Sequence, residues 1–474
     1  MPIQIYDSLK REPVPFETEE PGRVRMYACG PTVYNYVHIG NARTLVWFDF
    51  IRRYLTYRGY DVTYVMNYTD VDDKIIERSK IEKLPVDAIT QKYERAFEED
   101  MAALGARAAD IVCRATTHIG DMVAAIERLI EAGVAYEVEG DVWFAVERFP
   151  AYGRLSGRTL EDLRSGERVE PNPNKRHPVD FALWKAAKEG EPSWPSPWGA
   201  GRPGWHIECS VMSTKYLGMP FDLHGGGSDL IFPHHENEIA EAEATGGSSF
   251  VRHWLHAGMV QMGETKMSKS LGNIVLAHDA IAQVGGEPLR YWALSASYRA
   301  QTPFTEEVLA DARASYERWQ TFAVAARHVL GDDYPVLDAR PVRAGDEVID
   351  DPFVARFVEA MDDDFNSAGA FAVVHEVVRD ANKAIDSGDR ETLLALTRTF
   401  VELSEVLGFA FESDAGSSEL VGGLVEYLLE LREAARAERA FERADQIRDR
   451  LTSLGVVIED TSAGPRWRVG PAPD

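Results

Sequence analysis

Residues 29–41 read Cys29-Gly30-Pro31-Thr32-Val33-Tyr34-Asn35-Tyr36-Val37-His38-Ile39-Gly40-Asn41 and join a predicted strand to a predicted helix. Val24 to Ala28 has the composition of a short strand, and from Ala42 onward apolar residues recur at helical spacing. The first turn of a helix carries unpaired N–H groups and a partial positive charge, so Gly40 would let a polyphosphate approach the backbone while His38 donates to it. Taken alone, however, this pattern more often means a histidine and a glycine that only shape a turn.

A second motif lies far downstream, in a glycine-rich loop between Gly263 and Gly272. It reads Lys266-Met267-Ser268-Lys269-Ser270. Two lysines that flank a serine would stabilise a pyrophosphate as it gains charge on leaving, although such a loop by itself is also typical of a solvated basic turn. The order H-I-G-N and then K-M-S-K-S in one chain resembles class I aminoacyl-tRNA synthetases. This combination is much more specific than either motif alone.

The composition indicates a globular protein. The 474 residues suffice for two or three domains with a large core. The formal net charge of −26 argues against non-specific binding of nucleic acid, but a local basic strip remains compatible with RNA. We see no basic and apolar leader and no apolar run near the ~20 residues of a membrane span, so we expect a cytoplasmic protein without a membrane anchor. We also expect a monomer, because no extended apolar stripe is left over.

The order of predicted elements indicates an α/β fold. From Val24 to about Leu104 strands and helices alternate, which predicts a Rossmann-like, doubly wound parallel sheet as the catalytic domain. From about Thr116 to His206 the pattern changes to a helix, two strand-like segments and a Pro-, Gly- and Trp-rich stretch, which we interpret as an inserted connective domain. The sheet then resumes with a short strand, residues 221–223, and a loop that starts at His224.

The last part of the chain has the pattern of helices. Apolar residues recur along helix faces beyond residue 351, which predicts an α-helical bundle. A flexible break at 408–423 and a long helix at 424–454 then lead to a small C-terminal region. The predicted boundaries are 1–115 and 205–262 for the two halves of the catalytic domain, 116–204 for the insertion, 263–335 for the lysine loop and the helices after it, 336–415 for the bundle and 416–474 for the C-terminal region.

Loops that follow parallel strands meet at one edge of a sheet. Cys29 follows the first strand and Thr69 follows the second, residues 61–66, so we expect both to face one pocket. Three aspartates come next in the chain. Metal binding would suit them, but capping of the next helix and pairing with its dipole is the more common role of such residues: Asp70, Asp72 and Asp73.

A scattered set of side chains has the chemistry of a metal site. His234 and Glu238 are four residues apart, so they share one face of a helix, and Cys29 and Cys209 supply two thiols. Two thiolates, an imidazole and a carboxylate suit zinc. Buried structural cysteines and a surface His/Glu pair explain these residues equally well, and the rival ligands are His206, His224 and His235. We assign the third cysteine, Cys113, to the core, since three cysteines are too few for a disulfide framework.

Further motifs occur in order along the chain: C-G-P-T-V-Y from Cys29, N-Y-T-D-V-D-D-K from Asn67, W-H-I-E-C-S from Trp205, H-G-G-G-S-D-L from His224 and P-H-H-E-N-E from Pro233. With them the sequence closely resembles the cysteinyl-tRNA synthetase family, from about residue 3 to the C-terminus. The resemblance implies one zinc ion per chain, which binds the substrate thiolate, and Mg²⁺ with ATP. The implied zinc ligands are Cys29, Cys209, His234 and Glu238.

The resemblance also implies the substrates and the residues that bind them. L-cysteine, ATP and tRNA(Cys) would be the partners, and His38, Asn41, Lys266 and Lys269 the catalytic residues. The adenylate site would comprise His38, Ile39, Gly40, Asn41, Asp229, Lys266, Met267, Ser268, Lys269 and Ser270, with Thr69, Trp205 and His224 around the bound cysteine. The GCA anticodon would be read by Arg436, Phe441, Asp445, Arg448 and Asp460, where Phe441 replaces a commoner tryptophan but is still able to stack on a base.

Two other functions fit parts of the sequence. A ligase that joins cysteine to the amino sugar of mycothiol would share the zinc and adenylate sites but lack the C-terminal region. A degenerate synthetase-like RNA-binding protein would be expected to have lost the zinc ligands or the lysine motif, and both are intact. The C-terminal arginines at 432, 436, 439 and 443 have the spacing of one basic helix face, although a lattice of exposed salt bridges with Glu438 and Glu442 explains the same spacing.

Overall fold

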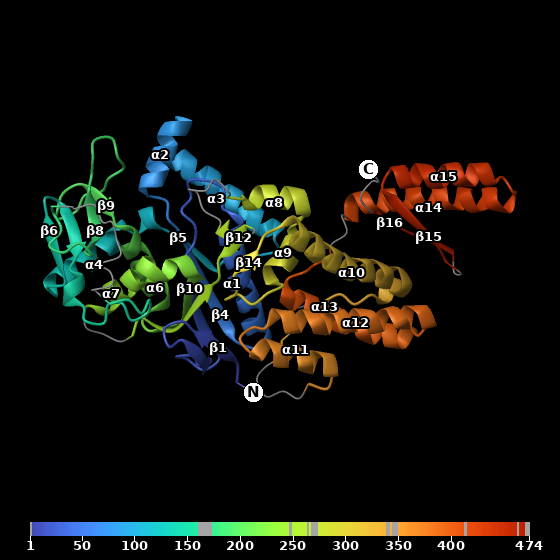
Figure 1. Cartoon of the computed structure of the whole chain (residues 1–474), viewed down its shortest axis with the longest axis horizontal. Helices are drawn as coiled ribbons and strands as arrows, with labels where there is room; N and C mark the ends of the chain where they lie inside the picture. The colour runs from blue at the N-terminus through green and yellow to red at the C-terminus, as the bar shows by residue number, and fades with distance from the viewer. Residues whose placement is uncertain are drawn as a thin grey trace. The chain divides into compact units, whose positions relative to one another are not determined.

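The computed structural model describes residues 2–159, 173–245, 249–262, 265–266, 274–337, 342–343, 349–411, 415–461 and 464–469. The chain divides into two compact units, Met1–Ala410 and Phe411–Asp474 (Figure 1). Among the described helices, none combines the length and the apolar character needed to cross a membrane.

A five-stranded parallel sheet forms the centre of the first unit. Its strand order is β11-β10-β3-β4-β5, and every neighbouring pair is parallel. The chain thus winds from β3 outward in one direction and then, from β10, in the other, which is the order of a doubly wound Rossmann-like fold and confirms the predicted class. The crevice at the carboxyl ends of β3 and β10 is where such sheets bind ligands. The strands are β3 (Arg23–Ala28), β4 (Asp61–Tyr68), β5 (Ile111–Arg114), β10 (Phe221–Gly227) and β11 (Val251–Ala257).

Strand β10 is longer than the sequence predicted. His224 to Gly227 were expected to form a loop, but they continue the strand and pair in parallel with β11. Gly225 is needed there because a Cβ atom would lie 2.1 Å from the carbonyl oxygen of Leu255. The glycines therefore permit close packing inside the sheet and do not mark a turn.

Helix α1 (Ile39–Tyr57) crosses over between β3 and β4 and is buried on nearly all sides. It starts three residues before Ala42, where the sequence predicted it, because Nδ1 of His38 accepts the backbone N–H of Asn41 at 3.2 Å and caps the helix. The helix packs against β4 and β10 on one side and against α9 (Gly286–Leu294) and α13 (Arg390–Leu407) on the other. It thereby fixes the H-I-G-N turn between the sheet and the helical region.

A buried ion cluster joins these helices. The Oδ2 atom of Asp49 in α1 lies 2.9 Å from Nε of Arg53 and 2.7 Å from Nη2 of Arg290 in α9. Nε of Arg290 also donates to the carbonyl oxygen of Leu407 at 2.8 Å, at the end of α13. Burial alone would raise the pKa of Asp49, but the attraction of Arg290 and Arg53 outweighs it and holds the pKa below its ordinary value. Asp49 is therefore ionised at neutral pH.

We expect Asp49→Asn to lower the free energy of unfolding by about 3–5 kcal/mol, because the buried guanidinium group of Arg290 would lose its counter-charge and that of Arg53 would lose the nearer of its two. Since the pKa of Asp49 is lowered in the folded state, its contribution is complete above the ordinary carboxyl pKa of about 4 and is lost as pH falls through the lower folded-state value. Urea unfolding at pH 7 and in mild acid measures both effects. The control is Glu317→Gln, which breaks the exposed pair with Arg313. An Asp49→Asn change as small as the control's would contradict the argument.

The insertion between β5 and α6 (Trp205–Leu217) contains a four-stranded antiparallel sheet of order β6-β7-β8-β9 and helix α4 (Ile119–Glu131). The two predicted strands are present as β6 (Ala135–Val138) and β7 (Asp141–Phe144), and β8 (Phe181–Ala186) and β9 (Gly201–Pro203) add two that the Pro- and Trp-rich pattern concealed. In Figure 1 this insertion lies at the opposite end of the first unit from the bundle helices α11 and α12.

The insertion is anchored to helix α7 (Glu236–Glu243) of the catalytic part. The carboxylate of Glu236 accepts the backbone N–H groups of Gly153 and Ser156 at 2.9 and 2.8 Å. The hydroxyl of Tyr152 donates to the side-chain oxygen of Asn237. Two consecutive residues of α7 thus hold the turn that follows the first strands of the insertion.

The predicted bundle is present as α11 (Pro352–Asp362), α12 (Ser367–Ser387) and α13, and α10 (Glu306–Leu330), which the sequence placed before the bundle, packs against α12 and α13. Side chains with a carboxylate, amide or hydroxyl group cap each of these helices, and each accepts a backbone N–H of the first turn, which satisfies a donor that the helix leaves unpaired. The capping residues are Thr305, Asp351, Asn366 and Asp389.

The second unit contains two helices and a hairpin: α14 (Ala415–Ala437), α15 (Phe441–Ser453), β15 (Val456–Thr461) and β16 (Gly464–Val469). Both terminal strands were predicted, but the expected break at 408–423 is wrong, because α14 already begins at Ala415. The predicted long helix is instead interrupted after Ala437, and Arg439 has a left-handed φ of +60° there. The four arginines expected on one helix face therefore belong to two helices and the turn between them.

Candidate active site and metal centre

The loops after β3 and β4 meet, as predicted from their places in the sheet. The backbone N–H of Val33 donates to the carbonyl oxygen of Thr69, and that of Thr69 donates to the carbonyl oxygen of Pro31, both at 3.2 Å. Gly30 makes this approach feasible, since a Cβ atom would lie only 1.7 Å from the backbone oxygen of Asn67. The loops that follow Cys29 and contain Thr69 thus lie side by side at the carboxyl edge of the sheet.

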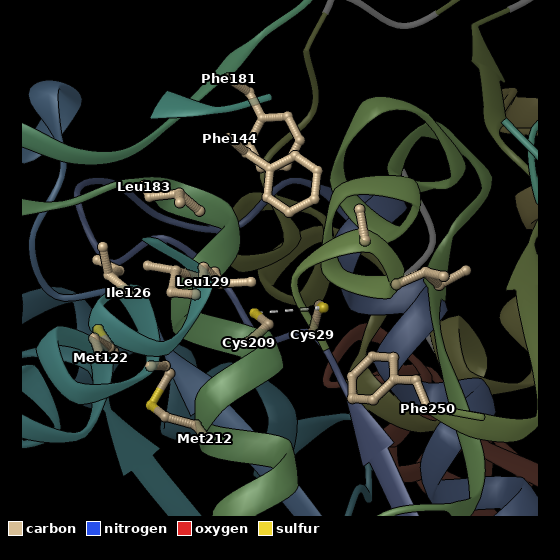
Figure 2. Packing of buried hydrophobic residues seen from close by; sticks show 14 of the residues in the cluster. Cys29, Met122, Ile126, Leu129, Phe144, Phe181, Leu183, Cys209, Met212 and Phe250 are labelled. Carbon is tan, nitrogen blue, oxygen red and sulfur yellow. Dashed lines mark hydrogen bonds between the residues drawn. The ribbon is translucent and has the colours of Figure 1, made fainter. Parts of the chain in front are cut away.

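Four side chains of the types that bind metal ions converge beside this loop, with donor atoms all within 4.8 Å of one another. They are Cys29 after β3, Cys209 in α6, His234 in the π-helical segment Ile231–His235, and Glu238 in α7. The two sulfur atoms are 3.7 Å apart and point towards each other (Figure 2). Nε2 of His234 lies 3.0 Å from Oε1 of Glu238, and each of the four residues is at most 8% exposed.

A second set of donors overlaps the first. It consists of Cys29 and Glu238 again, together with His224 and His235. Nε2 of His235 is 3.4 Å from the sulfur of Cys29, and Nε2 of His224 is 2.7 Å from Oε2 of Glu238. The rival ligands suggested by the sequence are therefore all close to the metal cluster, because the third rival, His206, contacts His234.

The surroundings favour the neutral form of each donor. Burial raises the pKa of Cys29 and of Glu238 well above their ordinary values, and burial lowers the pKa of His234 well below its ordinary value. A cation would supply the positive charge that allows such thiols to lose their protons. Two thiols, one imidazole and one carboxyl group with converging donor atoms fit a zinc ion.

Of the residues expected around the amino acid, Trp205 and His224 contact donors of this cluster, and Thr69 contacts the residue before one of them. Trp205 stacks on His234 with ring centroids 4.2 Å apart, and 37% of Trp205 is exposed. His224 stacks on Trp254 at 4.4 Å while it contacts Glu238. The hydroxyl of Thr69 donates at 2.9 Å to the carboxylate of Glu208, the residue before Cys209. Trp205 is therefore partly exposed to solvent and in contact with a buried donor.

The H-I-G-N turn contacts the chain that follows the lysine loop. The backbone N–H of Ile39 donates to Val275 and that of Ala277 donates to Val37, each at 2.9 Å. Burial lowers the pKa of His38, while nearby Asp229 acts in the opposite direction, and Asp229 is exposed at the end of β10. The side chain of Lys266 and the residues Met267, Ser268, Lys269 and Ser270 lie outside the described residues.

The predicted anticodon residues lie in the second unit. Phe441, Asp445 and Arg448 are exposed and share one face of α15, with 60% of Phe441 accessible to solvent. Arg436, near the end of α14, pairs with Glu433 at 3.2 Å. The side chain of Asp460 lies outside the described residues.

The sequence analysis overlooked buried residues that form hydrogen bonds beside the donor cluster. Nδ1 of His235 lies 2.8 Å from Nε2 of His256 in β11, and Ser210 donates to the buried carboxylate of Glu241 at 2.7 Å. The signal for His256 in the sequence was a pair of histidines, at 253 and 256, in a strand with apolar neighbours. Asp70, in contrast to the expected helix capping, accepts the backbone N–H of Thr116 at 2.9 Å, and Asp72 caps α2 (Asp73–Glu82) as predicted.

Comparison with known proteins identifies the family. Residues 15–314 match the family model for the tRNA synthetases class I (C) catalytic domain, residues 356–412 match the DALR domain, and residues 423–468 match the cysteinyl-tRNA ligase anticodon binding domain. Among solved structures, methionyl-tRNA synthetase of Mycobacterium tuberculosis is similar in fold, with a TM-score of 0.56 and 16% identity. The similarity spans 81% of this chain and 89% of that protein's chain. The leucyl-tRNA synthetase of Agrobacterium radiobacter covers 83% with 84% of its own, at a TM-score of 0.59 and 12% identity. These two similarities concern the fold.

Curated relatives extend over nearly the whole chain. The cysteine–tRNA ligase of Pelotomaculum thermopropionicum is 48% identical over 98% of this chain and 99% of its own length. That of Geobacillus thermodenitrificans is 46% identical over 99% of both. The match to an anticodon binding domain disfavours the amino-sugar ligase, and full-length enzyme relatives disfavour a degenerate RNA-binding protein. The chain therefore belongs to the cysteinyl-tRNA synthetases, the class I family of ATP-dependent ligases that join cysteine to tRNA.

Proposed function

We propose that the cluster at the ends of β3 and β10 selects L-cysteine by its thiol and that the H-I-G-N turn beside it holds ATP during formation of cysteinyl adenylate and pyrophosphate. The cysteine is then transferred to the 3′ end of tRNA(Cys). One observation carries this proposal: four donor atoms converge within 4.8 Å of one another. They lie at the carboxyl edge of the sheet, where Cys29 follows β3 and the chain leads into the H-I-G-N turn. The amino acid and the nucleotide would thus share one crevice, as the switch point of a doubly wound sheet requires.

The metal is proposed to be one zinc ion held by Cys29, Cys209, His234 and Glu238. When bound, zinc lowers the pKa of a thiol and binds the thiolate in preference to a hydroxyl. Cysteine would then be distinguished from serine by more than the ~10- to 200-fold that shape alone supplies, so no editing site is needed. Trp205, His224 and Thr69 would surround the substrate, with Trp205 covering the donors from the solvent side.

The nucleotide would bind at the start of α1. Gly40 lies in the first turn of α1, where its backbone N–H offers a donor to phosphate, and it lacks a side chain that would obstruct the approach. His38 uses Nδ1 to cap the helix, which leaves Nε2 for the nucleotide. Asn41, Asp229 and the lysine motif complete the proposed site, with Asp229 on the ribose and Mg²⁺ accompanying ATP. The second unit would read the anticodon through Arg436, Phe441, Asp445, Arg448 and Asp460.

Lys269→Ala should slow adenylate formation on the order of 100-fold, equivalent to about 3 kcal/mol of transition-state stabilisation, and should change cysteine affinity little. The reason is that the charge of Lys269 is needed mainly as pyrophosphate departs. Cysteine-dependent pyrophosphate exchange and equilibrium binding of cysteine separate the two effects. The exposed Lys383 in α12 serves as the control when replaced by alanine. Weaker cysteine binding at an unchanged rate would show that the lysine loop has a structural role.

One comparison of activities tests the function as a whole. Pyrophosphate exchange should require cysteine, and charging should require tRNA bearing the GCA anticodon. Joining cysteine to an amino sugar in place of tRNA would contradict the proposal, and so would the absence of cysteine-dependent exchange.

A further inference from the structure

His206 makes an unusual contact with the proposed metal ligand His234. It lies in the first turn of α6, and its Nδ1 atom is 2.8 Å from Nδ1 of His234. We propose that His206 is a positioning residue that fixes His234 with Nε2 towards Cys209 and Glu238, and that it thereby selects which of the two overlapping donor sets holds the metal. The inference rests on the metal-binding function proposed above.

The contact between two Nδ1 atoms determines where the protons are. Two imidazole nitrogens at this distance form a hydrogen bond only if one of them carries a proton and the other does not. A metal-binding imidazole offers its unprotonated nitrogen, and for His234 that atom is Nε2, which lies 3.0 Å from Oε1 of Glu238. Nδ1 of His234 must then donate, and Nδ1 of His206 must accept.

The ring of His206 is held in place for this role. Phe181 meets it edge-on with ring centroids 5.6 Å apart, and Trp205, which stacks on His234, lies 5.2 Å from His206. His206 is also three residues before Cys209 on α6, so the two residues share one helix face. A single helix therefore presents a thiol ligand and the acceptor that orients the imidazole ligand.

The competing donor set has a corresponding arrangement. Nδ1 of His235 lies 2.8 Å from Nε2 of His256, and Nε2 of His235 points to the sulfur of Cys29 at 3.4 Å. Because both sets use Cys29 and Glu238, the ion that one set holds is not available to the other. The set oriented by His206 offers two thiols where the other offers one, and zinc binds thiolates strongly. His206 and His256 thus make a matched pair of positions for an experiment.

The test compares His206→Asn and His206→Leu with His256→Asn and His256→Leu in the full chain. The amide oxygen of asparagine can take the place of Nδ1 as an acceptor, whereas leucine offers none. We expect His206→Leu to lower zinc affinity by about 10- to 100-fold, as loss of a partner of a metal ligand does, and His206→Asn to restore most of it. Chelator competition measures zinc affinity, and the visible spectrum of the Co²⁺ form reports the thiolate ligands.

The outcomes separate this inference from the proposed function. A wild-type chain that binds no zinc would contradict the metal-binding function itself. Zinc binding by the wild type that His206→Leu leaves unchanged would overturn only the role of His206. If the His256 variants lose as much zinc affinity as the His206 variants, or more, the ion belongs to the donor set that contains His235. If His206→Leu does not fold, His206→Ala replaces it, and failure of asparagine to bind zinc better than alanine overturns the inference.

Discussion

Replacement of Cys209 by serine is expected to remove most of the bound zinc and, with it, cysteine activation. Structural zinc sites bind with about 10–16 kcal/mol in total, so one of four donors accounts for about 3 kcal/mol or more, and affinity should fall at least on the order of 100-fold. Cys209 belongs to only one of the two donor sets, which makes it the informative cysteine to replace. Elemental analysis of the purified protein and pyrophosphate exchange with cysteine measure the two effects.

Cys113 provides the matched control for this experiment. It is also a buried free cysteine, but its thiol donates to the backbone oxygen of Met66 at 3.4 Å and it belongs to neither donor set. Cys113→Ser should therefore keep one zinc per chain. A second measurement compares the activation of cysteine with that of serine, because Cys209→Ser should lose the preference for cysteine. Full metal content and unchanged cysteine affinity in Cys209→Ser would show that the metal is held elsewhere.

Removal of the second unit should impair the charging of tRNA and leave the activation of cysteine nearly unchanged. A chain truncated after Ala410 ends where the first compact unit ends, so the sheet and the donor cluster stay intact. We expect pyrophosphate exchange with cysteine to change little. Stacking contributes about 1–3 kcal/mol per base, so the loss of contacts to three anticodon bases should lower kcat/KM for charging by at least about 100-fold.

Single substitutions refine this second prediction. Phe441→Ala removes the exposed ring at the start of α15 and should account for a large part of the loss, while Phe441→Trp should retain charging. The exposed Tyr427 in α14 supplies a control aromatic residue. Charging of tRNA(Cys) by the truncated chain at the rate of the intact chain would refute the role assigned to the second unit.

Much of the fold was predictable because its signals are local. β4 is rich in β-branched and aromatic residues, β3 ends in three buried residues, and the boundaries of both strands differ from the prediction by one or two residues. The meeting of Cys29 and Thr69 followed from topology alone, since both end parallel strands that lie side by side. The second half of strand β10 escaped prediction because glycines usually signal a turn, and here they serve the close approach of β11 and α1.

The choice among the histidines was beyond sequence reasoning. His224, His234 and His235 all reach the same carboxylate, and spacing along the chain gives no direction for a side chain. The orientation of His234 and His235 depends on contacts with residues from distant segments, His206 and His256. The break between α14 and α15 was missed for a related reason: alanines, glutamates and arginines continue through it with helical character, and only the left-handed Arg439 marks the turn.

The anchoring of the insertion has an energetic consequence. Helix α7 holds the insertion through Glu236 and Asn237 and presents Glu238 to the proposed metal cluster one residue later. A ligand that displaces the insertion therefore alters the free energy of binding at the cluster, and thermodynamic linkage makes the effect reciprocal. An occupant of the cluster must then change the affinity of the insertion for such a ligand by the same factor, and the ratio of the two affinities, with and without that occupant, measures the coupling.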